Sequence, residues 1–348
     1  MKKIFPGYYP MTQVETKSFL ENAVFVIDTC FLLDIFRLEE NDANSLLSIL
    51  KDDAIKRRLW LPYDIAWLYH QSINNEIIQQ ITNIQSTLHH LTSCKESISS
   101  KRRYPYLNTG MTQQLNTLIE QIHQTLDTQI NTLSGTLQSD NRKETINELF
   151  ENRIGEPYSD AQLNEIYVQA QERYSNSIPP GYCTEQNPNK RIMFHDMIIW
   201  EQMQKFASDC HTDVIFATGK TRDDWFYRVY GKIISPRQEL INEFYQKTNQ
   251  RFYCLNSATF IKDCCQTFSI IQPELSHLQE QLSEEIGYTA AAGVTLPAIA
   301  AAWFSGTSFA RAGSARINAE VRSVICNFII FPFIQTITLP SRDASADI

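Results

Sequence analysis

The stretch "AVFVIDTCFLLDIFR", residues 23–37, decides the fold. Residues 24–27 form an uninterrupted apolar run, which is typical of a strand buried on both faces. After Asp28 the apolar side chains recur at helical spacing, which predicts a helix over residues 29–37 with Thr29 as its cap. An aspartate after a buried strand has two interpretations. It is either a helix N-cap or a metal ligand at the carboxyl end of a parallel strand.

Further strand and helix signals follow along the chain. Residues 59–81 predict a short strand, a turn at Pro62 and a long helix, and "HDMIIWEQMQKFA" (195–207) predicts another helix. "DVIFATG" (213–219) predicts a second buried strand, and residues 251–264 predict a strand and a helix capped by Ser257. Strands that alternate with helices indicate an α/β fold with a parallel sheet.

The character of the sequence changes at three points along the chain, which divide it into four segments. Residues 81–176 are rich in Gln, Asn, Thr and Ser, yet Leu and Ile recur at helical intervals. We therefore expect a helical insertion of two or three long antiparallel helices, between a first α/β part (1–80) and a second (177–285). Residues 286–348 form an Ala-rich apolar extension, for which a buried or oligomerising tail is favoured over a membrane hairpin.

Charge and cysteine content limit the class of protein. The 348 residues carry a net charge of −8, which argues against a protein that is basic all over, although a local basic patch is enough to bind nucleic acid. The 8 cysteines include no CxxC pair, which favours a reducing, cytoplasmic environment.

Acidic residues occupy the positions that meet at one edge of such a sheet. Asp28 ends the first strand, Asp196 begins a helix, and Asp223 and Asp224 follow the second strand. Clustered carboxylates raise one another's pKa unless a positive group lies among them. Mg²⁺ or Mn²⁺ is the usual solution, and such a site activates water for attack on a phosphodiester.

Other polar groups lie near these carboxylates in the sequence. The hydroxyl groups of Thr29 and Thr218 are candidates for contact with water or phosphate. Lys220, Arg222 and Arg237 are the most credible phosphate-binding cations.

The order and spacing of several motifs resemble the bacterial PIN-like domains with a helical insertion. The resemblance covers about residues 1–270 and rests on "VFVIDTCFLLDIFR", "SIPPGY", "HDMIIWEQM" and "DVIFATGKTRDDWF" together with "SPRQELINEF" and "FYCLNSATFIK". It implies a PIN-like parallel-sheet sandwich and a metal-dependent nuclease, usually acting on RNA. Asp28, Asp196 and Asp224, the last preceding Trp225, match the acidic residues of the family.

The chain also departs from the family pattern. Leu68 stands where the family usually carries a metal-site Glu, and Asp64 and Glu76 are the candidates to replace it. Gly219 and Lys220 stand where many relatives have acidic residues.

Two functional hypotheses follow. The first is an endoribonuclease, for which single-stranded DNA stays open as a second substrate. Its catalytic residues are Asp28, Asp196, Asp224 and Glu76, and Mg²⁺ or Mn²⁺ is held by the three aspartates and Asp223. Family habit suggests a toxin or anti-phage effector. The second is a catalytically degenerate module that binds nucleic acid or a protein partner. Under either hypothesis the helical insertion is a candidate surface for a protein partner, and a homo-oligomer is a separate partner hypothesis. An aspartyl-phosphate phosphatase is disfavoured because Cys30 stands where that class needs a second aspartate.

Overall fold

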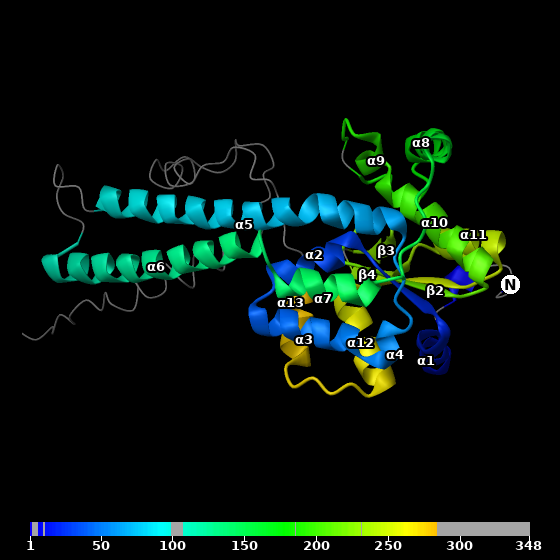
Figure 1. The fold of residues 1–348 in the computed structure, drawn as a ribbon, viewed down its shortest axis with the longest axis horizontal. Coiled ribbons are helices and arrows are strands. Elements are labelled where there is room, and N and C mark those ends of the chain that lie inside the picture. The colour runs from blue at the N-terminus through cyan, green and yellow to red at the C-terminus, as the bar shows by residue number, and fades with distance from the viewer. Residues whose placement is uncertain (2–5, 10, 99–106, 185, 231, 284–348) are drawn as a thin grey trace, which may run out of the picture. The chain divides into compact units, whose positions relative to one another are not determined.

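The computed structural model describes residues 1–348 apart from 2–5, 10, 99–106, 185, 231 and 284–348. The described residues up to 283 belong to one structural unit (Figure 1). Its elements before the first long helix are η1 (Pro6–Tyr8), α1 (Gln13–Asn22), β1 (Val24–Ile27), α2 (Thr29–Arg37), α3 (Glu40–Lys51) and α4 (Asp53–Lys56). The helices that follow are α5 (Tyr63–Ile98), α6 (Thr109–Thr136), α7 (Asn141–Phe150), α8 (Asp160–Ser175), α9 (Lys190–Met193) and α10 (His195–Cys210). The remaining elements are β2 (Val214–Thr218), β3 (Phe226–Val229), β4 (Lys232–Pro236), α11 (Gln238–Thr248), β5 (Phe252–Asn256), α12 (Ser257–Phe268) and α13 (Leu275–Ser283).

A parallel sheet in the order β1-β2-β5 lies at the centre of the unit. Val24 pairs with Val214 and Val214 with Phe252, so the three strands run in register and end at the same edge. β-Branched and aromatic side chains favour this pleated, fully buried arrangement. An isolated parallel bridge between Phe25 and Leu59 extends the pairing beyond β1. The predicted α/β fold with a parallel sheet is confirmed.

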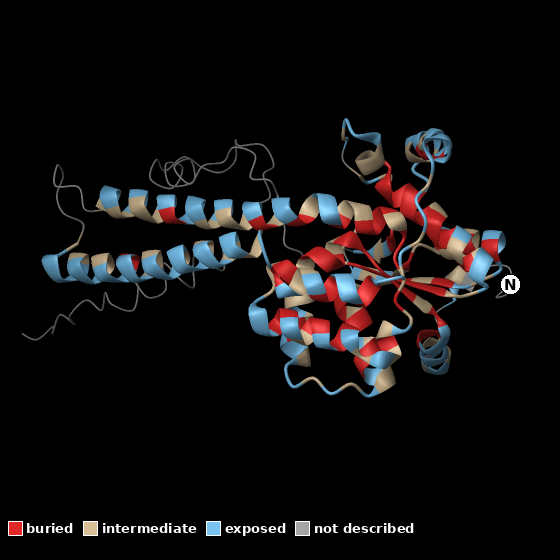
Figure 2. Cartoon of the chain, viewed as in Figure 1, coloured by how far each residue is buried: buried red, intermediate tan, exposed pale blue. Residues whose placement is uncertain are grey.

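Helices cover both faces of the sheet, and aromatic contacts show which helix packs against each face. Phe25 of β1 packs edge-on against Phe260 of α12, with ring centroids 5.3 Å apart. On the opposite face Phe252 of β5 packs against Trp200 of α10, with centroids 5.0 Å apart. The buried residues are concentrated around the strands and the helices that flank them (Figure 2). The carboxyl edge of the sheet is therefore held by a rigid core.

The predicted helical insertion takes the form of a long hairpin. Helices α5 and α6 lie side by side and extend away from the sheet (Figure 1). Leu88 and Ile119 are buried between them, and Thr92 Oγ1 lies 3.2 Å from His123 Nε2 across the seam. Helix α5 continues without a break through residue 81, where the insertion is expected to begin.

Two helix caps differ from those that the sequence predicts. Asp28, not Thr29, is the N-cap of α2, and Asn256, not Ser257, is the N-cap of α12. In both cases the cap has an extended backbone and its side chain accepts a backbone N–H from the first turn. Both predictions were wrong by one residue. The helix follows the strand directly, so the polar residue at the junction, before the predicted cap, is the N-cap.

The prediction for the Ala-rich extension concerns residues 286–348, which lie outside the described residues. Among the helices that the structure describes, none has the length and apolar character needed to cross a bilayer.

Candidate functional site

Asp28 is fully buried at the carboxyl end of β1. Its Oδ1 accepts the backbone N–H of Thr29 at 2.8 Å, and its Oδ2 accepts the hydroxyl of Thr218 at 2.7 Å. Thr218 ends the neighbouring strand β2, so the parallel register brings the two side chains together. The carboxylate is thus fixed at the edge of the sheet, where ligands bind in open α/β folds.

Asp196 lies in the first turn of α10 and is 2% exposed. Thr184 Oγ1 donates to its Oδ2 at 3.1 Å, and Lys220 Nζ donates to its Oδ1 at 2.8 Å. Arg222 Nη2 also donates to Oδ2. Burial alone would raise the pKa of Asp196, but the attraction of Lys220 and Arg222 outweighs it and lowers that pKa well below the ordinary value. Asp196 is therefore an ionised carboxylate in a polar cluster.

Asp224 is fully buried and completes the acidic group. Its Oδ2 accepts the backbone N–H of Gly181 at 2.9 Å and lies 3.1 Å from Arg222 Nη2. Its Oδ1 has no hydrogen-bond partner among the described residues. Burial raises the pKa of Asp224, and Arg222 opposes that shift. A buried carboxylate oxygen without a hydrogen-bond partner destabilises the folded state. Such unsatisfied groups are found mainly where the residue has a functional role.

Lys220 and Arg222 lie between the three carboxylates. Lys220 Nζ is 3.6 Å from Asp28 Oδ2 as well as bonded to Asp196, while Arg222 connects Asp196 with Asp224. Burial alone would lower the pKa of Lys220, but Asp196 and Asp28 raise it. We call Asp28, Asp196, Asp224, Lys220 and Arg222 the edge cluster.

The segment after β2 explains which side chains join the edge cluster. Residues 223–225 form a turn, in which the backbone N–H groups of Trp225 and Phe226 both donate to the carbonyl of Arg222. Lys220, Arg222 and Asp224 contact the cluster, whereas the side chain of Asp223 is 68% exposed and lies 3.7 Å from Arg228. The structure therefore does not bring Asp223 to the other carboxylates.

Two of the predicted substrate-binding residues have partners elsewhere. Arg237 Nη2 donates to Glu239 at 2.7 Å. Thr29 is buried, and its hydroxyl lies within 3.4 Å of the backbone oxygen of Ile65. Lys220 and Arg222 are the predicted phosphate ligands that lie among the carboxylates.

Neither candidate for the missing Glu joins the edge cluster directly. Glu76 forms a bidentate pair with Arg37, at 2.8 and 2.7 Å, and Arg37 also donates to Asp34 at 2.8 Å. Asp64 is fully buried but is bound by Arg191 at 2.6 Å and by Gln202 at 3.0 Å. Leu68, at the position of the family Glu, is half-buried on α5.

The sequence assigned no role to Thr184 or Gly181, and it did not predict that Asp34 pairs with Arg37. Thr184 and Gly181 hold Asp196 and Asp224 from the segment between α8 and α9, which has no periodic pattern that reveals its position. Asp34 lies close to the strand end, since a Cβ added to Gly219 would be 3.0 Å from Asp34 Oδ2. Glycine at position 219 is the one sequence signal that the Asp34 side chain comes close to the backbone at the end of β2.

The carboxylates have the oxygen donors that Mg²⁺ and Mn²⁺ prefer. However, across the described parts of the chain no three acidic, His or Cys side chains are grouped so that they could hold a metal ion. Lys220 and Arg222 occupy the positions between the carboxylates instead. In the arrangement observed, the residues do not fit a divalent metal.

Comparison with known families identifies the class of protein. Residues 24–240 match the profile of the family described as "PIN like domain". The chain therefore belongs to the PIN-like domain family, as the motif order predicts. PIN-like domains are generally nucleases, and the family typically uses a divalent metal. Searches of curated proteins and of solved structures gave no match.

Proposed function

We propose that this protein is an endonuclease that cuts RNA at the edge cluster. One observation carries the proposal. Three aspartates that are distant in the sequence, Asp28, Asp196 and Asp224, lie at one edge of the sheet of a PIN-like domain and share two cations. Buried, clustered carboxylates destabilise a fold unless they are compensated, so their presence favours a functional role.

The cations give the site its affinity for a phosphodiester. The side chains of Lys220 and Arg222 are 20% and 30% exposed, whereas those of the three carboxylates are at most 3% exposed. Solvent-facing Lys and Arg donors form charge-assisted bonds to phosphate oxygens. A nucleic-acid backbone can therefore reach these two residues although the chain carries a net charge of −8.

Dependence on Mg²⁺ or Mn²⁺ is part of the proposal, because the PIN-like family typically has it. Since the observed arrangement does not fit a metal, no chemical step is assigned to one. Cytoplasmic location is also proposed, and it is supported by the cysteines of the described ranges, which are all free.

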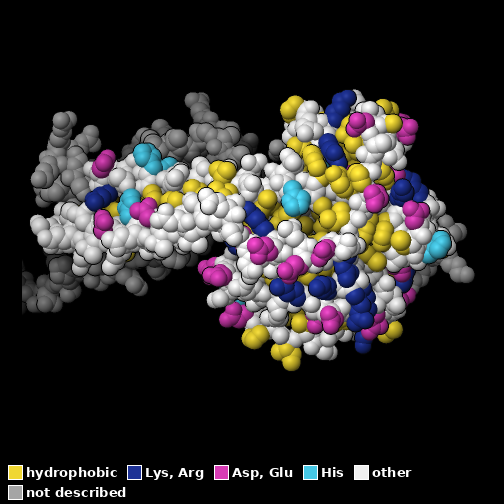
Figure 3. Space-filling view, in the orientation of Figure 1, with side chains coloured by type: hydrophobic (Ala, Val, Ile, Leu, Met, Phe, Trp, Pro, Cys, Tyr) yellow, Lys and Arg dark blue, Asp and Glu magenta, His cyan; other side chains and the backbone are white. Residues whose placement is uncertain are grey.

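The hairpin of α5 and α6 is proposed to bind a protein. Helix α6 carries Glu120 and Asp127 but no Lys or Arg. The face of the hairpin seen in Figure 3 consists mainly of uncharged polar side chains and backbone. Such a surface does not attract a phosphate backbone, which needs positive charge.

A catalytically degenerate binding module is the second candidate function. It is favoured by the two cations that lie among the carboxylates and by Leu68 at the position of the family Glu. In that case the edge cluster binds nucleic acid through Lys220 and Arg222 without cutting it.

Cleavage of end-labelled single-stranded RNA in the presence of Mn²⁺, with and without EDTA, tests the proposal. We expect wild type to cut only without EDTA and Asp196→Asn to be inactive. Asp209→Asn is the matched control, because Asp209 is exposed near the other end of α10. RNA binding without cleavage by folded wild type would support the degenerate module. Cleavage that persists in EDTA would contradict the metal requirement.

A further inference from the structure

Arg191 of α9 lies against aromatic side chains at the start of α5. Its guanidinium carbon is 4.4 Å from the ring centroid of Trp67 and 5.6 Å from that of Tyr63. Its Nε donates to Oδ1 of the fully buried Asp64 at 2.6 Å. Over α9 in Figure 3, basic side chains are bordered by hydrophobic ones. The guanidinium is therefore fixed both by a carboxylate and by aromatic rings.

The start of α5 is connected with the edge cluster through His195. The Nε2 atom of His195 lies 3.3 Å from the backbone oxygen of Asp64, and its Nδ1 lies 4.0 Å from Oδ1 of Asp196. The backbone oxygen of Ile65, the next residue of α5, lies 3.4 Å from the hydroxyl of Thr29, the first residue of α2. The first turn of α5 therefore lies next to the edge of the sheet at which a phosphodiester is proposed to bind.

Arg191 uses little of its capacity for interaction. Its side chain is 22% exposed, Nε makes its only hydrogen bond to a described residue, and Nη2 is buried without a partner. The charge of Asp64 balances that of Arg191, so the pair attracts a phosphate only weakly. Leu68, which follows Trp67, is half-buried and uncharged, so no carboxylate at that position repels a nucleotide. These residues therefore offer a ligand a flat stacking surface and little net charge.

We propose that Trp67 and Arg191 form a stacking subsite for one nucleobase of the strand whose phosphodiester binds at Lys220 and Arg222. This inference rests on the proposed function. Nucleobases that are not paired stack on aromatic rings and on guanidinium planes. Every base has such a face, so the subsite accepts any base. A base inside a duplex cannot reach it, so the nucleotide bound there is single-stranded.

Binding of fluorescein-labelled oligonucleotides to the full chain, measured by fluorescence anisotropy in EDTA and at low salt, tests the subsite without any cleavage assay. One probe is a short single-stranded RNA, and the other is a chain of abasic sugar-phosphate units of the same length. Trp67→Ala should weaken binding of the RNA by about 5–150-fold, the usual contribution of one stacked base. It should leave binding of the abasic chain unchanged, because phosphate contacts alone hold that chain.

Two further variants separate stacking from a structural role of Trp67. Trp67→Phe keeps an aromatic ring and should retain most of the affinity for the RNA. Tyr245→Ala is the matched control, because Tyr245 is a 40% exposed aromatic residue of α11 outside the subsite, and it should change neither affinity. Circular dichroism checks that each variant is folded.

The two probes also separate failure of the subsite from failure of the proposed function. An equal loss of affinity for both probes in Trp67→Ala would mean that Trp67 supports the structure and does not contact a base. No loss for either probe would mean that no base stacks there. Either result would overturn the subsite and leave the proposed nuclease intact, whereas no binding of RNA by folded wild type would overturn both.

Discussion

At the scale of single residues, Asp28 uses its two carboxylate oxygens for two different purposes. Oδ1 caps α2 through the N–H of Thr29, and Oδ2 faces Thr218 and Lys220. The cap fixes the side chain in one rotamer, and that fixed rotamer places Oδ2 at the edge of the sheet. A capping role and a site role for an aspartate after a strand are therefore compatible, and the first supports the second.

Asp34 predicts a pH dependence of stability. Burial raises its pKa from 3.8 to about 6, although Arg37 opposes the shift. Between these two pH values the folded state binds more protons at this residue than the unfolded state, so stability falls as pH rises through that range. The loss approaches about 3 kcal/mol above the folded-state pKa, because one pKa unit corresponds to about 1.36 kcal/mol.

Urea unfolding at about pH 4 and about pH 7, on either side of the transition, measures this effect. Asp34→Asn removes the titration, so we expect the variant to gain stability over wild type at the higher pH and much less at the lower. Asp223→Asn, at an exposed carboxylate, is the control and shows no such pH-dependent gain. An equal difference between Asp34→Asn and wild type at both pH values would refute the raised pKa.

The sequence predicts the acidic members of the site better than their partners. Asp28 and Asp196 follow from a strand end and a helix start, which periodicity reveals, whereas Asp224 is singled out by its place before Trp225 in the motif that resembles the family. The choice of Asp224 over Asp223 needs the geometry of the turn at residues 223–225, which places Asp224 inside the cluster and leaves Asp223 exposed. Apolar periodicity does not give that geometry, because the segment has too few apolar side chains.

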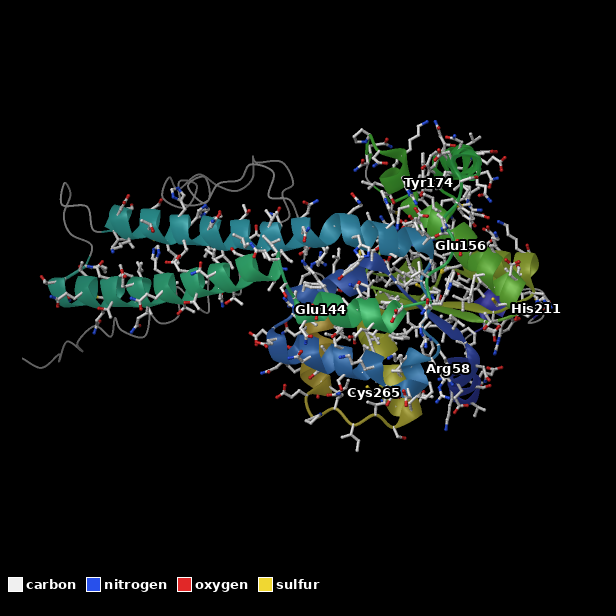
Figure 4. All side chains as sticks on the ribbon, viewed as in Figure 1. Arg58, Glu144, Glu156, Tyr174, His211 and Cys265 are labelled. Carbon is white, nitrogen blue, oxygen red and sulfur yellow. The ribbon has the colours of Figure 1, made fainter. Side chains whose placement is uncertain are left out.

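At the scale of elements, the loop between α8 and α9 positions Asp224 through Gly181. Gly181 has φ +94°, and a Cβ there would lie 2.0 Å from the hydroxyl of Tyr174, which is labelled in Figure 4. Both the backbone conformation and the space require glycine. Its N–H donates to Asp224, so a shift of this loop moves the hydrogen bond that holds the carboxylate.

Gly181→Ala is expected to lower the free energy of unfolding by more than about 1 kcal/mol. Gly135→Ala is the matched control, because a Cβ at Gly135 in α6 meets no described atom within 4 Å. Since alanine is the better helix former, that variant should gain up to about 1 kcal/mol. Urea unfolding compares the two. A Gly181→Ala protein as stable as wild type would contradict the steric account.

The hairpin depends on a narrow apolar seam, which two neighbouring residues of α6 can test. Ile119 is 5% exposed between the helices, whereas Leu118 is 54% exposed. Ile119→Ala should cost about 2–5 kcal/mol of local stability and accelerate hydrogen exchange in α6. Leu118→Ala should change it by less than about 0.5 kcal/mol. Equal exchange in the two variants would mean that the seam does not stabilise the hairpin.

Helix positions follow closely from the apolar period, but their ends do not. The predicted helix over residues 29–37 coincides with α2, and the hairpin follows from Leu and Ile at helical intervals. The caps of α2 and α12 were missed because two adjacent polar residues, Asp28–Thr29 and Asn256–Ser257, both suit an N-cap. Only the backbone conformation decides between them.

At the scale of the whole molecule, the parallel direction of the strands follows from the alternation of strand and helix signals. The parallel sheet brings β1, β2 and β5 to a common edge although α2 to α10 separate β1 from β2 in the sequence. The convergence of Asp28 with Asp224 is therefore a consequence of topology, and the family match over residues 24–240 includes both residues. The ion pairs within the edge cluster could not be predicted, because they depend on side-chain packing that a sequence pattern does not encode.

The central claim is that the edge cluster is a nucleolytic site, and a comparison of Asp224→Asn with Asp223→Asn tests it most directly. The two residues are adjacent, but Asp224 is buried in the cluster and Asp223 faces solvent. Single-turnover cleavage of labelled RNA with Mn²⁺ should fall by about a hundredfold or more in Asp224→Asn, as when one group that stabilises a transition state is removed. Asp223→Asn should cut at the wild-type rate, with both variants folded by circular dichroism. Equal rates in the two variants, or no cleavage by wild type, would contradict the account.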